Sequence, residues 1–382
     1  AVAEGCVLLK NDDKALPIRK GERVSVFGRI QFDYYKSGTG SGGAVNTRYV
    51  TNILDALKEN KDISVNEELE QTYRDWLKDH PFEKGMGWAQ EPWCQEEMPV
   101  TKELADQAAA KSDIAVVIIG RTAGEDKDNS AAEGSYLLTA AEHQMLKEVC
   151  GAFKRVAVLL NVGNIMDMKW VKEYDPAAVL YVWQGGQEGG AGAADVLTGT
   201  VTPCGKLSDT IALDISDYPS TEGFGDPTRV IYKEDIYVGY RYYDTYDKAV
   251  DYPFGFGLSY ATFAIDGVNV AKTGANTAHV TATVTNTSDV DAAETVQVYV
   301  APGKAAVARP KHELKGFRKV FLKAGESKTV TIDLDERAFA YWSEKYNDWH
   351  VESGEYAIEV GTSSRDIAET VTVALDGDGK TQ

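Results

Sequence analysis

Two loops hold residue types that could do chemistry, and the first of them is rich in glycine. Residues 36–43 read KSGTGSGG and follow the apolar run Arg23–Phe27. Glycine lets a backbone approach a ligand closely, and serine and threonine hydroxyls can hydrogen-bond to it. A nucleotide site is not expected, because about ten residues separate Gly28 from Gly38 and no Gly-Lys-Ser/Thr sequence follows. Taken alone, this loop is more simply interpreted as a flexible turn.

The second loop is acidic. Residues 121–128 read RTAGEDKD and follow the apolar run Ile114–Ile119. Carboxylates on such a loop can act as a general acid or base, or can bind a cation. They lack the EF-hand spacing with its central glycine, and a solvated charged loop is the plainer alternative. Spacing alone does not choose among the four carboxylates, which are Glu125, Asp126, Asp128 and Glu133.

No other group of residues favours a catalytic or metal site. The five histidines are scattered without a ligand pair, and no Gly-x-Ser-x-Gly sequence marks a nucleophilic serine. The four cysteines are far apart and form no Cys-x-x-Cys pair, so neither a zinc site nor a disulfide framework is expected. Reduced thiols are typical of a reducing compartment, and we expect the cytoplasm.

The composition is that of a soluble globular protein. Apolar residues make up 43% and charged residues 26% of the 382 residues, which excludes a largely disordered chain. The apolar runs are strand-sized, so a membrane-spanning helix is not expected. The 40 basic and 59 acidic residues give a net charge of −19, which disfavours nucleic acid and anionic membrane surfaces as partners.

The elements that must position both loops form an α/β pattern over residues 1–215. Apolar runs alternate with helical periodicity, which predicts a mainly parallel sheet sandwiched by helices. Ligands collect at the C-terminal ends of such strands, where both loops lie. The polar stretch Glu70–Met98 breaks the alternation and is interpreted as an insertion or extended loop. Expected strands are 23–27, 114–119, 155–160 and 178–182, and expected helices are 50–58, 101–110, 139–149, 166–172 and 191–197.

The pattern changes near residue 260. Residues 216–260 show little periodicity and are predicted to form an irregular connection. Over residues 261–376, strands of period two alternate with turn residues, which predicts an all-β sandwich. Residues 377–382 are interpreted as a tail or linker. Expected strands here are 279–285, 295–300, 328–333, 355–360 and 369–374.

Long motifs along nearly the whole chain resemble one protein family. They are AEGCVLLKNDDKALPI, KSGTGSGGAVNTRYV, GQEGGAGAADVLTGTVTPCGKL, EDIYVGYRYYDT, YPFGFGLSYATF, RPKHELKGFRKV and GEYAIEVGTSSRDI. These motifs resemble glycoside hydrolase family 3, the family of many β-glucosidases and β-xylosidases. The resemblance implies an α/β sandwich domain at 1–215 and a fibronectin type III-like (immunoglobulin-like) domain at 261–376.

The resemblance also implies roles for the two loops. The stretch TAGEDKDNSAAEGSYLL corresponds to the loop that carries the family's acid/base, which implies Glu125 for that role with Glu133 in reserve. Ser41 is implied to hydrogen-bond the bound sugar, with Gly40 beside it in the substrate-facing loop. The candidate stacking faces for a sugar or aglycone, with core or loop packing as the alternative, are Trp88, Trp93 and Tyr136.

The implied reaction is retaining hydrolysis of a β-linked glucoside or related glycoside by two carboxylates, without a metal or organic cofactor. In this family the nucleophilic aspartate sits on a separate TIM-like barrel, and no barrel pattern occurs here. We therefore expect a segment of a retaining exo-β-glycosidase, a β-glucosidase above others, that is inactive alone. Its barrel would lie in the same gene product or in a companion chain, and a homo-oligomer is allowed for. The alternative is a non-catalytic carbohydrate-binding or adhesion module.

Overall fold

The computed structural model describes residues 1–43 and 45–380. The chain divides into two compact units, Ala1–Gly205 and Lys206–Gln382, which are taken in turn below. Within the described residues, no helix combines the length and the apolar character that crossing a bilayer requires.

The first unit is built on a six-stranded mixed sheet in the order β1-β6-β5-β4-β2-β3. Strands β2 to β6 pair in parallel, and β1 joins the edge antiparallel to β6. Every residue of β4 and β5 is buried, as the continuous apolar runs predict for a sheet covered on both faces. The strands are β1 (Val7–Asn11), β2 (Arg23–Phe27), β3 (Ser64–Val65), β4 (Ile114–Arg121), β5 (Val156–Val162) and β6 (Ala178–Tyr181).

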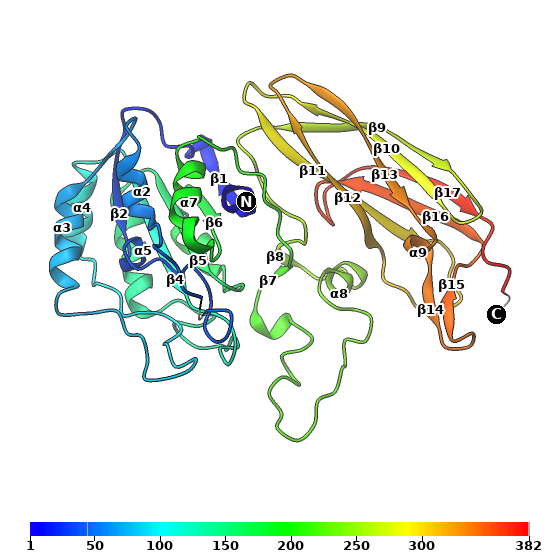
Figure 1. Cartoon of the computed structure of the whole chain (residues 1–382), viewed down its shortest axis with the longest axis horizontal. Helices are drawn as coiled ribbons and strands as arrows, with labels where there is room; N and C mark the ends of the chain where they lie inside the picture. Colours follow the sequence, from blue (N-terminus) through cyan, green and yellow to red (C-terminus); the bar gives the residue numbers. More distant parts are fainter. Residues whose placement is uncertain (44, 381–382) are drawn as a thin grey trace. The chain divides into compact units, whose positions relative to one another are not determined.

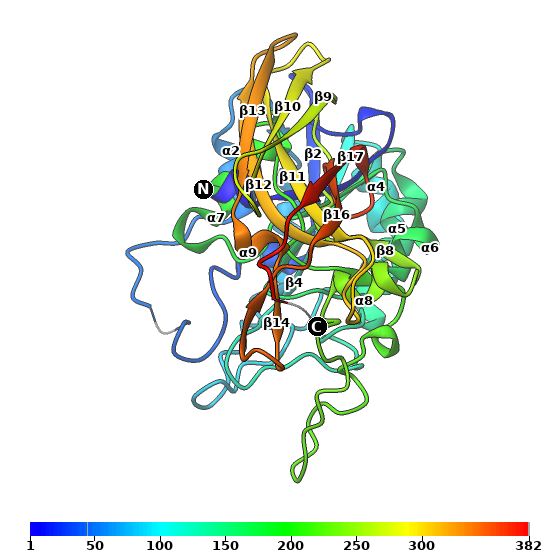
Figure 2. The same cartoon turned by 90° about the vertical axis from the view of Figure 1, so that its right-hand side faces the viewer.

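Helices cover both faces of this sheet, which confirms the predicted α/β sandwich. Helix α2 packs on α7, and α4 and α6 both pack on α5; Figure 2 shows these two groups on opposite sides of the strands. Thr139 forms the predicted capping box with Glu142 at the start of α5. The helices are α1 (Val2–Gly5), α2 (Ile53–Glu59), α3 (Glu67–Trp76), α4 (Lys102–Ala109), α5 (Ala140–Ala152), α6 (Lys169–Tyr174) and α7 (Gly189–Leu197).

The stretch Glu70–Met98 is only partly the irregular insertion that the sequence suggested. Its first seven residues belong to α3, which Asn66 caps by accepting a hydrogen bond from the Leu69 backbone. Leu69 and Tyr73, four residues apart, bury one face of this helix. The charged residues on either side of it hid that short apolar stripe. Between Leu77 and Lys102 the backbone is irregular.

The sheet reverses its winding between β2 and β4. After β2 the chain passes through α2 to β3 on one side, whereas after β4 it passes through α5 to β5 on the other. In α/β sheets such a reversal leaves a crevice outside the C-terminal ends of the two strands, and ligands bind there. The connections that follow these strands, 28–52 and 122–139, contain the glycine-rich and acidic loops.

The second unit is the predicted β-sandwich. A three-stranded sheet (β13-β10-β9) and a four-stranded sheet (β12-β11-β16-β17) enclose an apolar core that includes Val284, Val298, Phe339 and Ile358. The strands are β9 (Phe263–Lys272), β10 (Ala278–Asn286), β11 (Ala292–Pro302), β12 (Glu313–Leu322), β13 (Ser327–Leu334), β16 (Gly354–Gly361) and β17 (Ile367–Leu375), with α9 (Glu336–Phe339) and the hairpin β14 (Tyr341–Ser343)–β15 (Asp348–His350) beside them.

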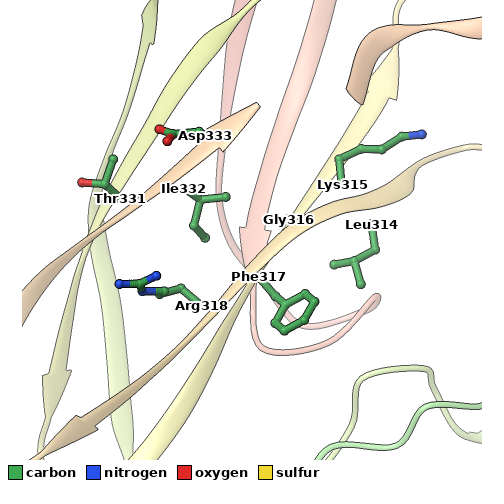
Figure 3. Close-up of a pocket in the computed structure, with 8 residues that line it drawn as sticks. All are labelled: Leu314, Lys315, Gly316, Phe317, Arg318, Thr331, Ile332 and Asp333. Atoms are coloured by element: carbon green, nitrogen blue, oxygen red, sulfur yellow. The ribbon is translucent and has the colours of Figure 1, made fainter. Parts of the chain in front are cut away.

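Strands β12 and β13 flank an open depression of about 470 Å³ on the sandwich (Figure 3). Gly316 lets the strands approach here, because a β-carbon at this position would lie 2.5 Å from Ile332 Cγ2. The lining of this depression combines Lys315, Arg318 and Asp333 with apolar side chains and holds no grouping typical of catalysis.

Part of the connection 206–260 packs on the sandwich. Its regular elements are β7 (Ile211–Ala212), α8 (Tyr240–Thr245) and β8 (Val250–Tyr252). The Tyr240 ring stacks on Phe254 with centroids 4.6 Å apart, and its hydroxyl accepts a hydrogen bond from the Leu314 backbone at 2.8 Å. Residues 240–260 are thus anchored to the sandwich by aromatic packing.

Candidate functional site

The glycine-rich and acidic loops are joined to each other beyond the C-terminal ends of β2 and β4. The Thr39 backbone N–H donates to the Ala123 carbonyl at 2.6 Å, and Thr39 and Gly124 form an isolated parallel β-bridge. The buried Thr39 hydroxyl also donates to the Glu125 carbonyl at 3.1 Å. These contacts hold the backbone of the acidic loop in a fixed register against the glycine-rich loop.

Two glycines make this close approach sterically feasible. A β-carbon on Gly38 would lie 2.1 Å from the Ala123 carbonyl oxygen. Gly40 has a φ of +76°, which residues with a side chain rarely adopt, and its β-carbon would lie 2.4 Å from Glu125 Cβ. The glycines are therefore needed for loop-to-loop packing, whatever ligand the loop meets.

Glu125 is the carboxylate that this packing brings to the glycine-rich loop. Its side chain is exposed, and its Oε2 accepts hydrogen bonds from the Ser41 backbone N–H at 3.1 Å and from the Ser41 hydroxyl at 2.9 Å. The backbone N–H first, and then the hydroxyl, lower the pKa of Glu125 below its usual value. Within this chain the carboxylate is thus ionised at neutral pH and can accept a proton.

A buried arginine fixes the base of the acidic loop. Arg121, the last residue of β4, donates to both carboxylate oxygens of Glu142 at 2.6 and 2.7 Å. The same guanidinium donates to the Ser135 and Leu137 carbonyls at 3.1 and 3.2 Å. Arg121 therefore ties the two ends of the loop and the start of α5 to one planar group, four residues before Glu125.

Asn161, at the end of β5, holds the start of the glycine-rich loop. Its side-chain oxygen accepts from the Tyr35 N–H at 2.8 Å, and its amide donates to the Tyr35 and Trp183 carbonyls at 3.0 and 2.6 Å. This fully buried amide satisfies backbone groups where the strands end. Three neighbouring strands thus contribute to the geometry of the two loops.

A carboxyl with a raised pKa is bound to the turn that follows β2. Burial raises the pKa of Glu97 to about 8, against the opposing effect of hydrogen bonds from the Arg29 and Met98 backbones. These bonds fix the turn that follows β2, and the side chain is buried. We interpret Glu97 as a structural residue.

The other residues singled out from the sequence have diverse surroundings. Trp93 lies beside the acidic loop: its carbonyl accepts from the Thr122 N–H at 2.8 Å, and the Lys127 ammonium is 5.4 Å from its ring centroid. Trp88 is 57% exposed in the irregular segment. Tyr136 is only 2% exposed, so its ring packs in the core and is not an open stacking face.

Glu133, the reserve candidate, lies in a separate tight turn of the same loop. The Gly134 N–H donates to the Leu137 carbonyl at 2.9 Å, and the Leu137 N–H donates to the Ala132 carbonyl at 3.1 Å. Glu133 is exposed. In the described part of the chain, Ser41 donates its hydrogen bonds to the carboxylate of Glu125.

The acidic loop forms no metal centre among the described residues. Across residues 1–43 and 45–380, no three His, Cys, Asp or Glu side chains are grouped so that they could hold a metal ion. The contacts described at the loops join the Glu125 carboxylate to hydrogen-bond donors of Ser41.

Three residues that position the site were missed from the sequence, namely Thr39, Arg121 and Asn161. Arg121 and Asn161 carry a recognisable signal, because each is a polar residue at the end of an otherwise apolar strand, IAVVIIGR or VAVLLNV. A polar side chain in such a place must find partners on burial. Thr39 had no signal that separated it from its neighbours.

Comparison with known proteins identifies two family domains in the chain. The model described as "Glycosyl hydrolase family 3 C-terminal domain" matches residues 6–260. The model described as "Fibronectin type III-like domain" matches residues 294–364.

Relatives with related sequences are longer than this chain. An exo-α-(1→6)-L-arabinopyranosidase from Bifidobacterium breve is 51% identical over all of the chain and 49% of its own length. A β-glucosidase from Ruminococcus albus is 47% identical over 98% of the chain and 40% of its own length. The crystal structure of a β-glucosidase from Paenibacillus barengoltzii superposes with a TM-score of 0.93 at 49% identity, over 99% of this chain and 42% of that one. The chain thus spans about half the length of the curated relatives it matches.

Proposed function

Since the chain belongs to glycosyl hydrolase family 3, we propose that it is the acid/base-bearing part of a retaining exo-β-glycosidase, a β-glucosidase. Glu125 is the general acid/base, and a TIM-like barrel in the remaining half of the enzyme supplies the nucleophile. The observation that carries this proposal is the exposed Glu125 carboxylate, held by Ser41 beyond the C-terminal ends of β2 and β4.

In the proposed reaction the nucleophile attacks the anomeric carbon while Glu125 protonates the leaving oxygen. Glu125 then removes a proton from the water that releases the sugar. Retaining hydrolysis requires the two carboxyl groups to lie about 5–5.5 Å apart, so the barrel must bring its aspartate close to Glu125.

The lowered pKa of Glu125 supports the division of the site between two parts of the enzyme. A general acid must hold its proton near the working pH, and the exposed, hydrogen-bonded Glu125 does not. Contact with the barrel would bury this side chain and add the negative charge of the nucleophile, and both changes raise a carboxyl pKa. This chain alone is accordingly inactive in our proposal.

The remaining loop residues take supporting roles. Ser41 hydrogen-bonds both Glu125 and the bound sugar, and Gly40 gives the loop its close approach to Glu125. Trp93, already beside the acidic loop, and Trp88 offer aromatic faces to the sugar or aglycone. Glu133 is kept in reserve as the acid/base.

We also keep the wider expectations as proposals. The domain limits are 1–215, 216–260 and 261–376, followed by a tail.

The four unpaired cysteines are typical of a protein in a reducing compartment, for which we propose the cytoplasm. The family membership favours an enzyme over a carbohydrate-binding or adhesion module. A homo-oligomer is kept as a further proposal.

A second substrate class follows from one relative. The Bifidobacterium breve protein, 51% identical over the whole chain, is an exo-α-(1→6)-L-arabinopyranosidase. The same two-carboxylate chemistry can cleave either glycoside, so sugar contacts on the barrel decide between them. Comparing kcat/KM for aryl β-glucosides and aryl α-L-arabinopyranosides in the complete enzyme tests this choice.

The acid/base assignment is tested by Glu125→Gln in the complete gene product. We expect kcat for glycosides with poor leaving groups to fall by about 10²–10⁴-fold. Activated aryl glycosides should lose less, because their leaving groups need no proton, and azide should rescue release of the glycosyl enzyme. Glu133→Gln, at the reserve candidate in the same loop, should be nearly silent, and a loss of this size there instead would move the role to Glu133. Unchanged kinetics of Glu125→Gln would eliminate the assignment.

A further inference from the structure

An unusual concentration of exposed apolar side chains occurs in one stretch of the second unit, which we call the apolar segment (residues 219–239). The structure shows six large apolar residues there at 45% exposure or more. Phe224 is 64% exposed and Tyr232 81% exposed. The six residues are Phe224, Val230, Ile231, Tyr232, Ile236 and Val238.

The apolar segment is held by local bonds. All residues from 224 to 233 are exposed. The ends of this stretch are tied by an ion pair between Lys233 and Glu222 at 2.8 Å, and short-range backbone bonds such as Tyr237 N–H to the Glu234 carbonyl at 2.8 Å shape its turns. Figures 1 and 2 both show it extending away from the strands of its own unit.

Beside the apolar segment lies an open cavity of about 580 Å³. Its lining includes the aromatic side chains of Tyr218, Tyr242 and Tyr243 together with Pro219. Contiguous exposed apolar surface is rare on soluble proteins and marks interaction sites when it occurs. The segment is thus a protruding apolar surface, and the cavity beside it combines aromatic rings with the charged side chains of Asp217, Glu222 and Lys248.

We propose that the apolar segment docks on the half of the complete enzyme that this chain does not span, which in the proposed function carries the barrel. This inference rests on the proposed function for the identity of that half. The relatives extend well beyond the matched region, since the chain covers 42% of the Paenibacillus barengoltzii structure at a TM-score of 0.93. The apolar segment lies within the region matched by the family domain, residues 6–260.

Limited trypsin digestion of the complete gene product tests the docking. Arg229 and Lys233 lie within the apolar segment, whereas Lys304 lies in an exposed turn of the sandwich and serves as the reference site. Covering by the other half should make cleavage at Arg229 roughly tenfold or more slower than at Lys304. Cleavage at Arg229 as fast as at Lys304 would show that nothing covers the segment, and the proposal would be overturned.

A matched pair of variants separates docking from general stability. Phe224→Ser/Val238→Ser removes two exposed apolar residues from the segment and should accelerate cleavage at Arg229 about tenfold. Phe321→Ser/Val290→Ser removes an equivalent pair from the sandwich and should not. Equal acceleration by both pairs would contradict the proposal.

Two further measurements separate docking on the barrel from the proposed function and from contact with a second copy of the chain. Glu125→Gln should lower kcat for glycosides with poor leaving groups by about 10²–10⁴-fold and leave protection at Arg229 unchanged, so the proposed function and the docking fail separately. Protection that disappears on dilution of the protein would assign the segment to contact with a second copy of the chain and would overturn docking on the barrel.

Discussion

Replacing Gly40 by alanine should displace the Glu125 carboxylate while leaving the fold intact. The added β-carbon would lie 2.4 Å from Glu125 Cβ and 2.9 Å from its Oε2. Carbon atoms pack at about 3.5–4.0 Å, so the two loops must separate by roughly 1 Å. The φ of +76° adds about 1–2 kcal/mol of backbone strain for a residue with a β-carbon.

The consequence for catalysis follows from the size of this displacement. A shift of about 1 Å in a catalytic group can cost on the order of 10²-fold in rate. We therefore expect kcat of the complete enzyme on an unactivated glucoside to fall by about that factor in Gly40→Ala. The hydrogen bonds from Ser41 to Glu125 should weaken with the same movement.

Gly42→Ala is the control, because it lies two residues away in the same loop. A β-carbon at Gly42 would meet nothing within 4 Å, and its φ lies outside the left-handed region. This variant should keep kcat within about twofold and stability within about 0.5 kcal/mol. The assay is steady-state hydrolysis together with thermal unfolding of both variants. Equal kcat in Gly40→Ala and Gly42→Ala would refute the claim that this contact positions Glu125.

Two further predictions concern stability. Arg121→Met leaves Glu142 buried without its partner and should cost about 3–5 kcal/mol in chemical denaturation, whereas adding Glu142→Leu should regain part of that loss. Burial opposes a charge on His312, but hydrogen bonds to Asp244 at 3.1 Å and Glu359 at 2.5 Å outweigh it and raise the pKa of His312. The charged His312 stabilises the folded state fully below about pH 6.5, and this stabilisation is lost as the pH rises through the raised pKa. His312→Gln should therefore flatten the fall in unfolding temperature at alkaline pH. An unchanged slope of unfolding temperature against pH would contradict this assignment.

Elements with local signals were predictable from the sequence. Continuous apolar runs predicted β4 and β5, and the Thr139–Glu142 spacing predicted the start of α5. Strand β1 was missed, because it owes its place to antiparallel pairing with a strand about 170 residues away, as in Val7 opposite Tyr181. Helix α3 was missed, because its apolar stripe is short and lies among charges.

The candidate site was also predictable from the sequence only in part. Both loops were identifiable from residue type and from their position after parallel strands, while the role of Glu125 stays a prediction drawn from family resemblance. The hydrogen bond from Ser41 to Glu125 joins residues 84 positions apart, and no spacing rule predicts it. Only the contact explains why the pKa of this carboxyl is lowered by Ser41. In our proposal, a general acid at Glu125 therefore needs burial by another part of the enzyme.

The sequence by itself determined the two fold classes, the two loops and the strand ends that carry them, because hydrophobic periodicity and turn residues act over a few neighbours. The tertiary structure decided that the loops are joined through Thr39, that Arg121 clamps one of them, and which carboxylate is held by Ser41. These features depend on which distant strands become neighbours in the sheet. Burial and charge at a site are set by that neighbourhood, and local sequence does not encode it.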